Sequence, residues 1–338
     1  MSAGVIFMQW ENYVGGKGGA SFFSQEPLTF NSRQERLHQL VPGDHLWLVS
    51  RCPEDAQYYF VAVLAVSTLA RNPTESENGQ LFGEYAVICD RANSRDLGKR
   101  IPAEALLRAF AFETDRPIKY GAIIGQSLQT LRLLSGSDQR VLDAVLKRSL
   151  VKDARHVEML CGLWTKCDAV FADYFLKNWS ERGSSMAFLL YDPPPAVRPG
   201  SPVFIHSDKN LRLVARFLEG QFVAGHKLTV EKEERLEERE RVWSRYRAHT
   251  IDPPVKRDFD AFWDGQNGVR ALFEMDEVTE LPESVAFKVY GRALEWGYPM
   301  GVGYRYLSLA QSVLLLRMAA LPHGQGELFL QGILGVER

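Results

Sequence analysis

The stretch PGDHLWLVSRCPEDAQYYFVAVLAV (residues 42–66) decides the fold, because it has the pattern of a β-hairpin. A Pro-Gly turn leads into an apolar strand, a polar turn and a second apolar strand. The stretch PGSPVFIHSDKNLRLVARFLEG (residues 199–220) repeats this order in the second half of the chain. Since all hairpins share these signals, coincidence is the alternative to an internal duplication. We predict that one small module is used twice.

The composition is typical of a globular protein with more than one domain. The chain has 338 residues, of which 46% are hydrophobic and 24% charged, and a single hydrophobic core seldom grows to this length. The longest apolar runs are too short to cross a bilayer, and the first residues lack the features of a secretory signal. Four scattered cysteines suit reduced thiols better than a disulfide framework. We therefore expect a cytoplasmic protein that makes no membrane contact.

A long amphipathic helix is expected in the middle of the chain. Apolar residues recur there at spacings of three and four: Val157, Leu160, Trp164, Cys167, Phe171 and Phe175. Gly183 follows as a candidate left-handed cap. These signals predict a first module over residues 1–150, a connecting helix over 151–183, and a second, diverged module over 184–338. The fold class would be α+β, with two small mixed β-barrels joined by the helix.

The second half contains further predicted elements. VRALFEMDEVTEL (residues 269–281) and SVAFKVYGRALEW (residues 284–296) are interpreted as strands, and a charged helix is expected from Glu231 to His249. The last helix should begin at Ser308, because Ser308 and Gln311 form an S-x-x-Q capping box.

Sequence signatures of common enzymes are incomplete in this chain. GGKGG (residues 15–19) does not fit a phosphate-binding loop, and GQSLQ (residues 125–129) lacks the second glycine of a nucleophile elbow. We therefore predict a protein that is not an enzyme, with no catalytic residue, no metal site and no cofactor. A metal-dependent nuclease that assembles Asp276, Glu277 and Glu295 from distant segments is an open alternative.

Aromatic residues interleaved with glycine provide the positive signal for binding. An aromatic face can stack on a base, and neighbouring glycines allow a ligand to approach the backbone. The base-binding candidates are Trp10, Asn12, Tyr13, Ser21 and Trp47 in the first half, and Trp296, Tyr298 and Tyr304 in the second. Phe22, Phe23, Gln266 and Asn267 lie near them in the sequence. The alternative is that most of the rings fill two small barrel cores.

Cationic residues cluster locally although the formal net charge of the chain is −2. Arg91, Arg95, Lys99 and Arg100 fall within one short segment, and Arg305 lies among the second group of aromatics. Local patches, rather than the net charge, decide phosphate contacts. These five residues are the phosphate-binding candidates, with scattered solvated charges as the alternative.

The two hairpins also resemble a known superfamily. GDHLWLVSR followed by YYFVAVLAV is similar to the PUA-like superfamily, particularly its EVE, ASCH and YTH branches. This resemblance implies a pseudo-barrel that holds RNA or modified DNA bases in an aromatic-lined pocket, and Trp10 and Trp47 match the pocket aromatics by approximate location. In the second half, Ser201 replaces the acidic residue of the turn, and the charged helix is inserted after the hairpin.

Together these signals predict a reader of a modified or flipped base in DNA or RNA. The resemblance implies a prokaryotic defence or RNA-processing setting for such a reader. The alternative is a scaffold subunit of a multi-protein complex, in which the helix from Glu231 to His249 would dock a partner protein.

Overall fold

A computed structural model describes most of the chain. The described residues are 2–15, 19–72, 83–113, 115–119, 121–149, 160–189, 197–222, 244, 271–297 and 304–334. They form two compact units, Met1–Val157 and Glu158–Arg338, each of which combines helices with one mixed sheet. The predicted α+β class is therefore confirmed. No helix of the described residues is long and apolar enough to cross a membrane.

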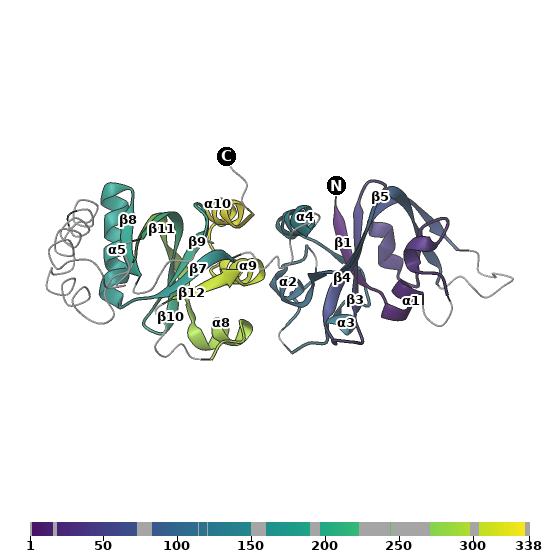
Figure 1. The fold of residues 1–338 in the computed structure, drawn as a ribbon, viewed down its shortest axis with the longest axis horizontal. Helices are drawn as coiled ribbons and strands as arrows, with labels where there is room; N and C mark the ends of the chain where they lie inside the picture. Colours follow the sequence, from purple (N-terminus) through teal and green to yellow (C-terminus); the bar gives the residue numbers. More distant parts are fainter. Residues whose placement is uncertain are drawn as a thin grey trace, which may run out of the picture. The chain divides into compact units, whose positions relative to one another are not determined.

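The first unit is built on a six-stranded sheet (Figure 1). Its strands are β1 (Ala3–Phe7), β2 (Thr29–Ser32), β3 (His45–Arg51), β4 (Tyr58–Arg71), β5 (Tyr85–Pro102) and β6 (Arg132–Leu133). Its helices are α1 (Trp10–Val14), α2 (Glu104–Ala109), α3 (Ile124–Ser127) and α4 (Gly136–Ser149), with 3-10 turns η1 (Phe22–Ser24) and η2 (Glu35–Gln39). The predicted hairpin is β3 and β4, which pair antiparallel.

The second unit is also built on a six-stranded sheet. Its strands are β7 (Leu160–Lys166), β8 (Ser185–Leu189), β9 (Pro202–Ser207), β10 (Asn210–Phe222), β11 (Ala271–Ala286) and β12 (Tyr304–Ser308). Its described helices are α5 (Ala169–Arg182), α8 (Phe287–Ala293), α9 (Leu309–Met318) and α10 (His323–Leu334). The second predicted hairpin is β9 and β10.

The two sheets have the same strand order. It is β2-β5-β4-β3-β1-β6 in the first unit and β8-β11-β10-β9-β7-β12 in the second. In each unit the opening strand pairs parallel with the first hairpin strand, β1 with β3 and β7 with β9. The other neighbouring pairs are antiparallel in both units. The two units therefore have the same sheet topology over six consecutive strands.

The irregularities of the two sheets also coincide. In the pairing of β4 with β5 the register shifts between Phe60 and Ala62, Val63 and Ala65, and Val66 and Thr68. In the pairing of β10 with β11 it shifts between Leu211 and Leu213, Val214 and Arg216, and Phe217 and Glu219. The spacing of the three shifts is identical. Because bulges re-aim side chains and bend strands, the units share local geometry as well as topology.

The Pro-Gly turn has the same hydrogen bonding in both units. Gly43 and Gly200 adopt φ angles of 92° and 88°, in the region that other residues enter only with strain. The Gly43 N–H donates to the Val66 carbonyl over 2.8 Å, and the Gly200 N–H donates to the Phe217 carbonyl over 2.7 Å. Each glycine therefore sets the start of its hairpin.

The closing helices begin alike. The Ser308 and Gln311 side chains each accept from the other's backbone N–H, which confirms the predicted capping box of α9. At the start of α4, Ser135 and Asp138 exchange the same pair of bonds, at 3.2 and 3.3 Å. A reciprocal cap satisfies two N–H groups that the helix itself leaves unpaired.

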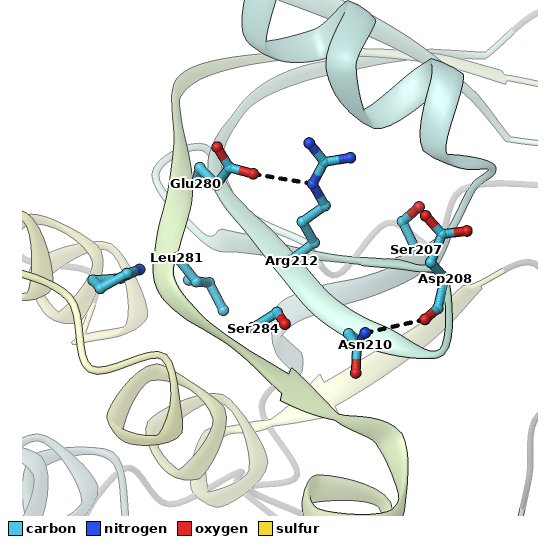
Figure 2. Close-up of a pocket in the computed structure, with 8 residues that line it drawn as sticks. Ser207, Asp208, Asn210, Arg212, Glu280, Leu281 and Ser284 are labelled. Atoms are coloured by element: carbon cyan, nitrogen blue, oxygen red, sulfur yellow. Dashed lines mark hydrogen bonds and ion pairs between the residues drawn. The ribbon is translucent and has the colours of Figure 1, made fainter.

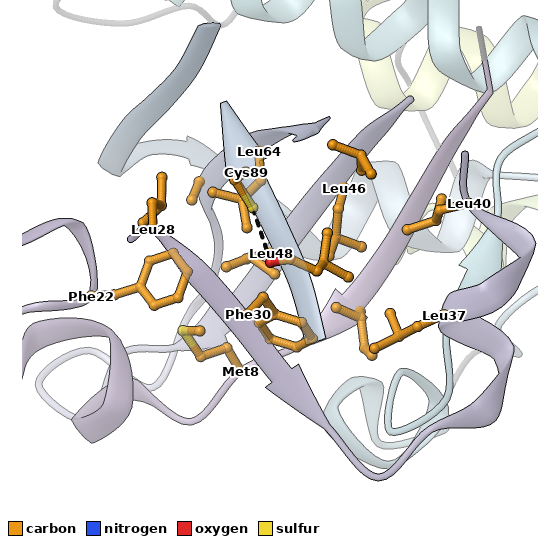
Figure 3. Packing of buried hydrophobic residues seen from close by; sticks show 14 of the residues in the cluster. Met8, Phe22, Leu28, Phe30, Leu37, Leu40, Leu46, Leu48, Leu64 and Cys89 are labelled. Carbon is orange, nitrogen blue, oxygen red and sulfur yellow. Dashed lines mark hydrogen bonds between the residues drawn. The ribbon is translucent and has the colours of Figure 1, made fainter. Parts of the chain in front are cut away.

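Each unit has its own hydrophobic core. In the first, residues from η1, β2, β3, β4 and β5 pack on one face of the sheet, including Phe22, Phe30, Leu48 and Leu64 (Figure 3). In the second, Ala172 and Phe175 of α5 pack on residues of β9, β10 and β11. The two cores allow each unit to be considered separately.

Two predicted elements are wrong. The long connecting helix is not formed over the described part of its span: residues 160–166 are strand β7, and α5 begins at Ala169. β7 lies between β9 and β12, so this segment belongs to the second unit rather than to a connector. The segment from Phe287 is not a strand but helix α8, which buries Phe287, Tyr290 and Gly291 at helical spacing. Gly183 does cap α5 in the left-handed conformation. The charged helix predicted from Glu231 to His249 lies outside the described residues, apart from Ser244.

Candidate functional site

Aromatic and charged residues from α1 and β5 meet on the surface of the first unit. We call Trp10, Tyr13, Asp96, Lys99 and Arg100 the α1–β5 surface. α1 ends at a glycine, Gly15, with a φ angle of 80°. A Cβ on Gly15 would lie 2.5 Å from the Gly19 carbonyl oxygen, so the tight turn requires glycine.

Tyr13 fixes α1 to β5. Its side chain is buried, and its hydroxyl donates to Asp96 Oδ1 over 2.5 Å. Burial, followed by the Asp96 carboxylate, raises the pKa of Tyr13 well above its usual range. The phenol therefore remains a neutral donor, and its ring lies 5.5 Å from the half-buried ring of Trp10.

β5 presents its four cationic candidates to solvent. Ser94 and Leu97 are buried, whereas Arg91, Arg95, Lys99 and Arg100 are exposed. The Lys99 ammonium lies 5.5 Å from the centre of the Trp10 ring and 2.6 Å from Glu54 Oε2. The structure thus brings Trp10, Tyr13, Lys99 and Arg100 together, as a combined base and phosphate site would require.

The other two cations of β5 are tied to the backbone. The Arg91 guanidinium donates to the carbonyls of Phe23 and Gln25 and pairs with Glu26, so it holds the η1 loop against the strand. Arg95 donates to the carbonyls of Ala92 and Ser94. Both positive charges remain exposed, so both still contribute to the local potential.

The remaining first-unit candidates differ in exposure. Asn12 and Ser21 are exposed, whereas Trp47 has no exposed surface and contacts Phe60 edge to face. Phe22 is buried and Phe23 half-buried. Trp47 therefore packs in the interior and offers no face on which a base could stack.

The second-unit candidates form a separate cluster. The Arg305 guanidinium lies 4.8 Å from the centre of the Trp296 ring, and Trp296 contacts Trp164 edge to face. Tyr304 packs on Tyr306, with ring centres 5.2 Å apart. Tyr298, Gln266 and Asn267 lie outside the described residues.

A buried hydrogen-bond chain lies behind Trp296. The Trp164 indole donates to the Tyr290 hydroxyl over 3.2 Å, and Tyr290 is 2.6 Å from His206 Nδ1. This geometry suits a tyrosine that donates to a neutral histidine. Burial, with a smaller effect from Lys166, lowers the pKa of His206 to about 4.

The hydrogen-bonded residues Trp164, Tyr290 and His206 have no polar counterparts in the first unit. The matching strand registers place Val5 and Val49 where the second unit has Trp164 and His206. The Ala103 N–H donates to the Tyr58 carbonyl at the start of β4, and the Phe287 N–H donates to the Lys209 carbonyl just before β10. Ala103 and Phe287 are therefore equivalent, and so are Leu106 and Tyr290, three residues further on. These hydrogen bonds could not be expected from the sequence, because the three residues lie on distant elements and match no spacing motif.

The carboxylates considered for a nuclease are separated or already paired. Asp276 makes a bidentate ion pair with Arg216, at 2.7 and 2.5 Å, and Glu277 lies 4.0 Å from the same guanidinium. Glu295 follows α8 on a different segment. Across the described ranges no group of three or more His, Cys, Asp or Glu residues could hold a metal ion.

A pocket of about 590 Å³ opens at the β9–β10 turn of the second unit (Figure 2). Its polar lining comprises Ser207, Asp208, Asn210, Arg212, Glu280 and Ser284. Arg212 pairs with Glu280 at 3.1 Å and with Asp173 of α5 at 2.6 Å. The sequence did not single out this pocket.

Comparison with known proteins gives a limited likeness. No family model matches the chain, and no curated protein matches it. Among solved structures, an ASCH protein from Zymomonas mobilis is similar at 9% identity and a TM-score of 0.35, over 47% of this chain and 96% of that one. A mutant of that protein is similar at 11% identity and a TM-score of 0.35, over 48% and 98%. ASCH is one of the branches that the sequence resembles. At these TM-scores the likeness carries no argument about activity.

Proposed function

We propose that the protein is a non-enzymatic nucleic-acid reader whose first unit binds DNA or RNA at the α1–β5 surface. One observation carries this proposal: aromatic residues 10 and 13 and cationic residues 99 and 100 lie together, although 86 or more positions separate the two groups. Aromatic rings beside exposed cations suit a base and its phosphate.

In this proposal Trp10 stacks on a base. Its ring is half-buried and braced by Tyr13, so little freedom is lost when a base packs on it. Asn12 lies two residues after Trp10 on α1, its side chain is exposed, and it is the candidate for reading the hydrogen-bonding edge of a modified or flipped base. Lys99 and Arg100 contact the phosphates, with Arg91 and Arg95 adding to the local potential.

We further propose that the two units arose by duplication of one PUA-like module, of the EVE or ASCH kind. The identical strand order and the three coincident register shifts support this. All four cysteines are free, which supports a cytoplasmic protein, and a base reader would serve prokaryotic defence or RNA processing.

The test is a salt series of oligonucleotide binding, measured by fluorescence anisotropy on the full chain. The double variant Lys99→Gln/Arg100→Gln should bind about tenfold more weakly at low salt. The slope of log K against log salt should fall by about one to two, because each phosphate contact releases counterions.

The matched control is Lys147→Gln, which removes an exposed cation from α4 of the same unit. Its affinity and salt slope should equal those of the wild type. If both variants lose the same affinity, only a general charge effect is present. If neither does, or if the wild type binds no oligonucleotide, the proposal is wrong.

A further inference from the structure

We infer that the turn between β3 and β4 opposes nucleic-acid binding at the α1–β5 surface, because its Glu54 carboxylate holds Lys99 where a phosphate would bind. The inference rests on the proposed function and concerns the regulation of the same site. It is carried by the position of Lys99, by the carboxylates beside it, and by the length of the turn.

Lys99 and Trp10 contact each other in the free protein. The ammonium lies over the Trp10 ring, 5.5 Å from its centre. A base that stacks on this face of the ring needs the ammonium to move off it, because stacked rings are in van der Waals contact. Stacking there therefore requires a displacement of Lys99.

Two carboxylates hold Lys99 in this position. Its ammonium lies 2.6 Å from Glu54 Oε2 and 3.9 Å from Asp55 Oδ2. Hydrogen bonds to Cys52 and then to Glu54 raise the pKa of Lys99 above its ordinary value, so the side chain remains charged at neutral pH. A phosphate oxygen that bound the ammonium would lie beside Glu54, and the two negative charges would repel each other unless Glu54 withdrew.

Glu54 is free to withdraw, whereas Asp55 is fixed. The Glu54 side chain is 75% exposed, and Lys99 is its only hydrogen-bond partner among the described residues. Asp55 accepts from the Gln57 N–H over 3.0 Å and from the Tyr59 hydroxyl over 2.9 Å, so it shapes the turn. Glu54 is therefore the residue that can exchange with a phosphate.

The turn that carries Glu54 is longer than its counterpart in the second unit. It comprises residues 52–57, whereas the β9–β10 turn comprises residues 208–209. The additional residues bring a carboxylate to the cation of β5.

The second unit also lacks the cation on which this carboxylate acts. Asp96 and Glu280 each pair with the first residue after the same register shift, so they occupy equivalent places. Three residues further on, Lys99 of β5 corresponds to Glu283 of β11. The longer turn and the cation thus occur together, as expected of a turn that acts on Lys99.

The test is fluorescence anisotropy of a single-stranded oligonucleotide with the full chain. Glu54→Gln keeps the size of the side chain and removes its charge. This variant should bind about twofold to fivefold more tightly than the wild type, the range that an exposed ion pair supports. In the Lys99→Gln background the same substitution should lose this effect, because the two residues act as a pair.

The matched control is Glu35→Gln, which removes the same charge from η2, an exposed position of the same unit. Its affinity should change by less than about 1.5-fold, because an exposed charge without a partner contributes little. Thermal unfolding of each variant checks that it folds.

The outcomes separate this inference from the proposed function. If the wild type binds and Glu54→Gln binds equally or more weakly, the inference is overturned and the proposed function stands. The same holds if the gain equals that of Glu35→Gln, or if it persists in full without Lys99. If neither the wild type nor Glu54→Gln binds the oligonucleotide, both are overturned.

Discussion

Trp10 is the residue on which base recognition depends in the proposed site. Trp10→Ala should weaken oligonucleotide binding about tenfold, because stacking on one aromatic ring contributes about 1–3 kcal/mol. Trp10→Phe should retain most of the affinity, since a phenyl ring still offers a face. Fluorescence anisotropy at fixed salt measures both, and equal affinities for wild type and Trp10→Ala would exclude a stacking role.

His206 should make the stability of the second unit depend on pH. Its pKa of about 4 in the folded protein lies below its ordinary value of 6.5, so between these values the unfolded chain binds the extra proton. Stability is therefore complete above about pH 6.5 and falls by up to roughly 1.4 kcal/mol per pH unit as the pH drops toward 4. Urea unfolding at pH 7, 5.5 and 4.5 measures this loss.

A control variant for His206 can be designed from the residues at the equivalent positions of the first unit. The double variant His206→Val/Tyr290→Leu installs the residues that the first unit has at these positions, Val49 and Leu106. The loss of stability between pH 6.5 and 4 should then shrink. An unchanged pH dependence in this variant would show that another group is responsible.

The capping box of α9 gives a prediction about one element. Ser308→Ala removes the hydroxyl that accepts from the Gln311 N–H, and should cost about 1 kcal/mol. The melting temperature of the second unit should fall by about 2–4 °C. Ser180→Ala on α5 is the control, because the Ser180 hydroxyl donates to the Lys177 carbonyl within the helix and does not cap it. Equal effects of the two substitutions would argue against the cap.

The hairpins and caps could be predicted because their signals are local. Gly43, Gly200 and Gly183 adopt the left-handed conformations that their positions in the sequence suggest. β7 (LCGLWTK) could not be recognised, because the apolar residues of this strand do not alternate with polar ones and its Leu160 and Trp164 also fit a helical stripe. α8 was recognisable: Phe287, Tyr290, Gly291 and Leu294 are buried at helical spacing.

The sequence indicated which residues are candidates for the site, but not which of them contact one another. The aromatic and cationic candidates Trp10, Tyr13 and Lys99 were identified from composition, and the structure places them together. The hydrogen bond from Tyr13 to Asp96 could not be predicted. The second half of β5 is polar, so the sequence does not indicate that the strand continues to Pro102 and includes Asp96. Trp47 shows the opposite case, an aromatic candidate that fills a core.

At the scale of the whole molecule, one fold carries two different surfaces. Strand order, register shifts, turn glycines and reciprocal caps are the same in both units. The side chains at equivalent places differ. β5 carries cations at positions where β11 carries acidic and neutral residues, and the first unit has Val5, Val49 and Leu106 where the second unit has the hydrogen-bonded residues Trp164, His206 and Tyr290. We expect the units to bind different ligands.

The most direct test of nucleic-acid binding by the first unit is ultraviolet cross-linking of a single-stranded oligonucleotide to the full chain, followed by mass spectrometry of the peptides. Cross-links should fall in peptides that contain residues 10–13 and 91–100, and should weaken in the Lys99→Gln/Arg100→Gln variant. Cross-links confined to the second unit, or none at all, would contradict the proposed function.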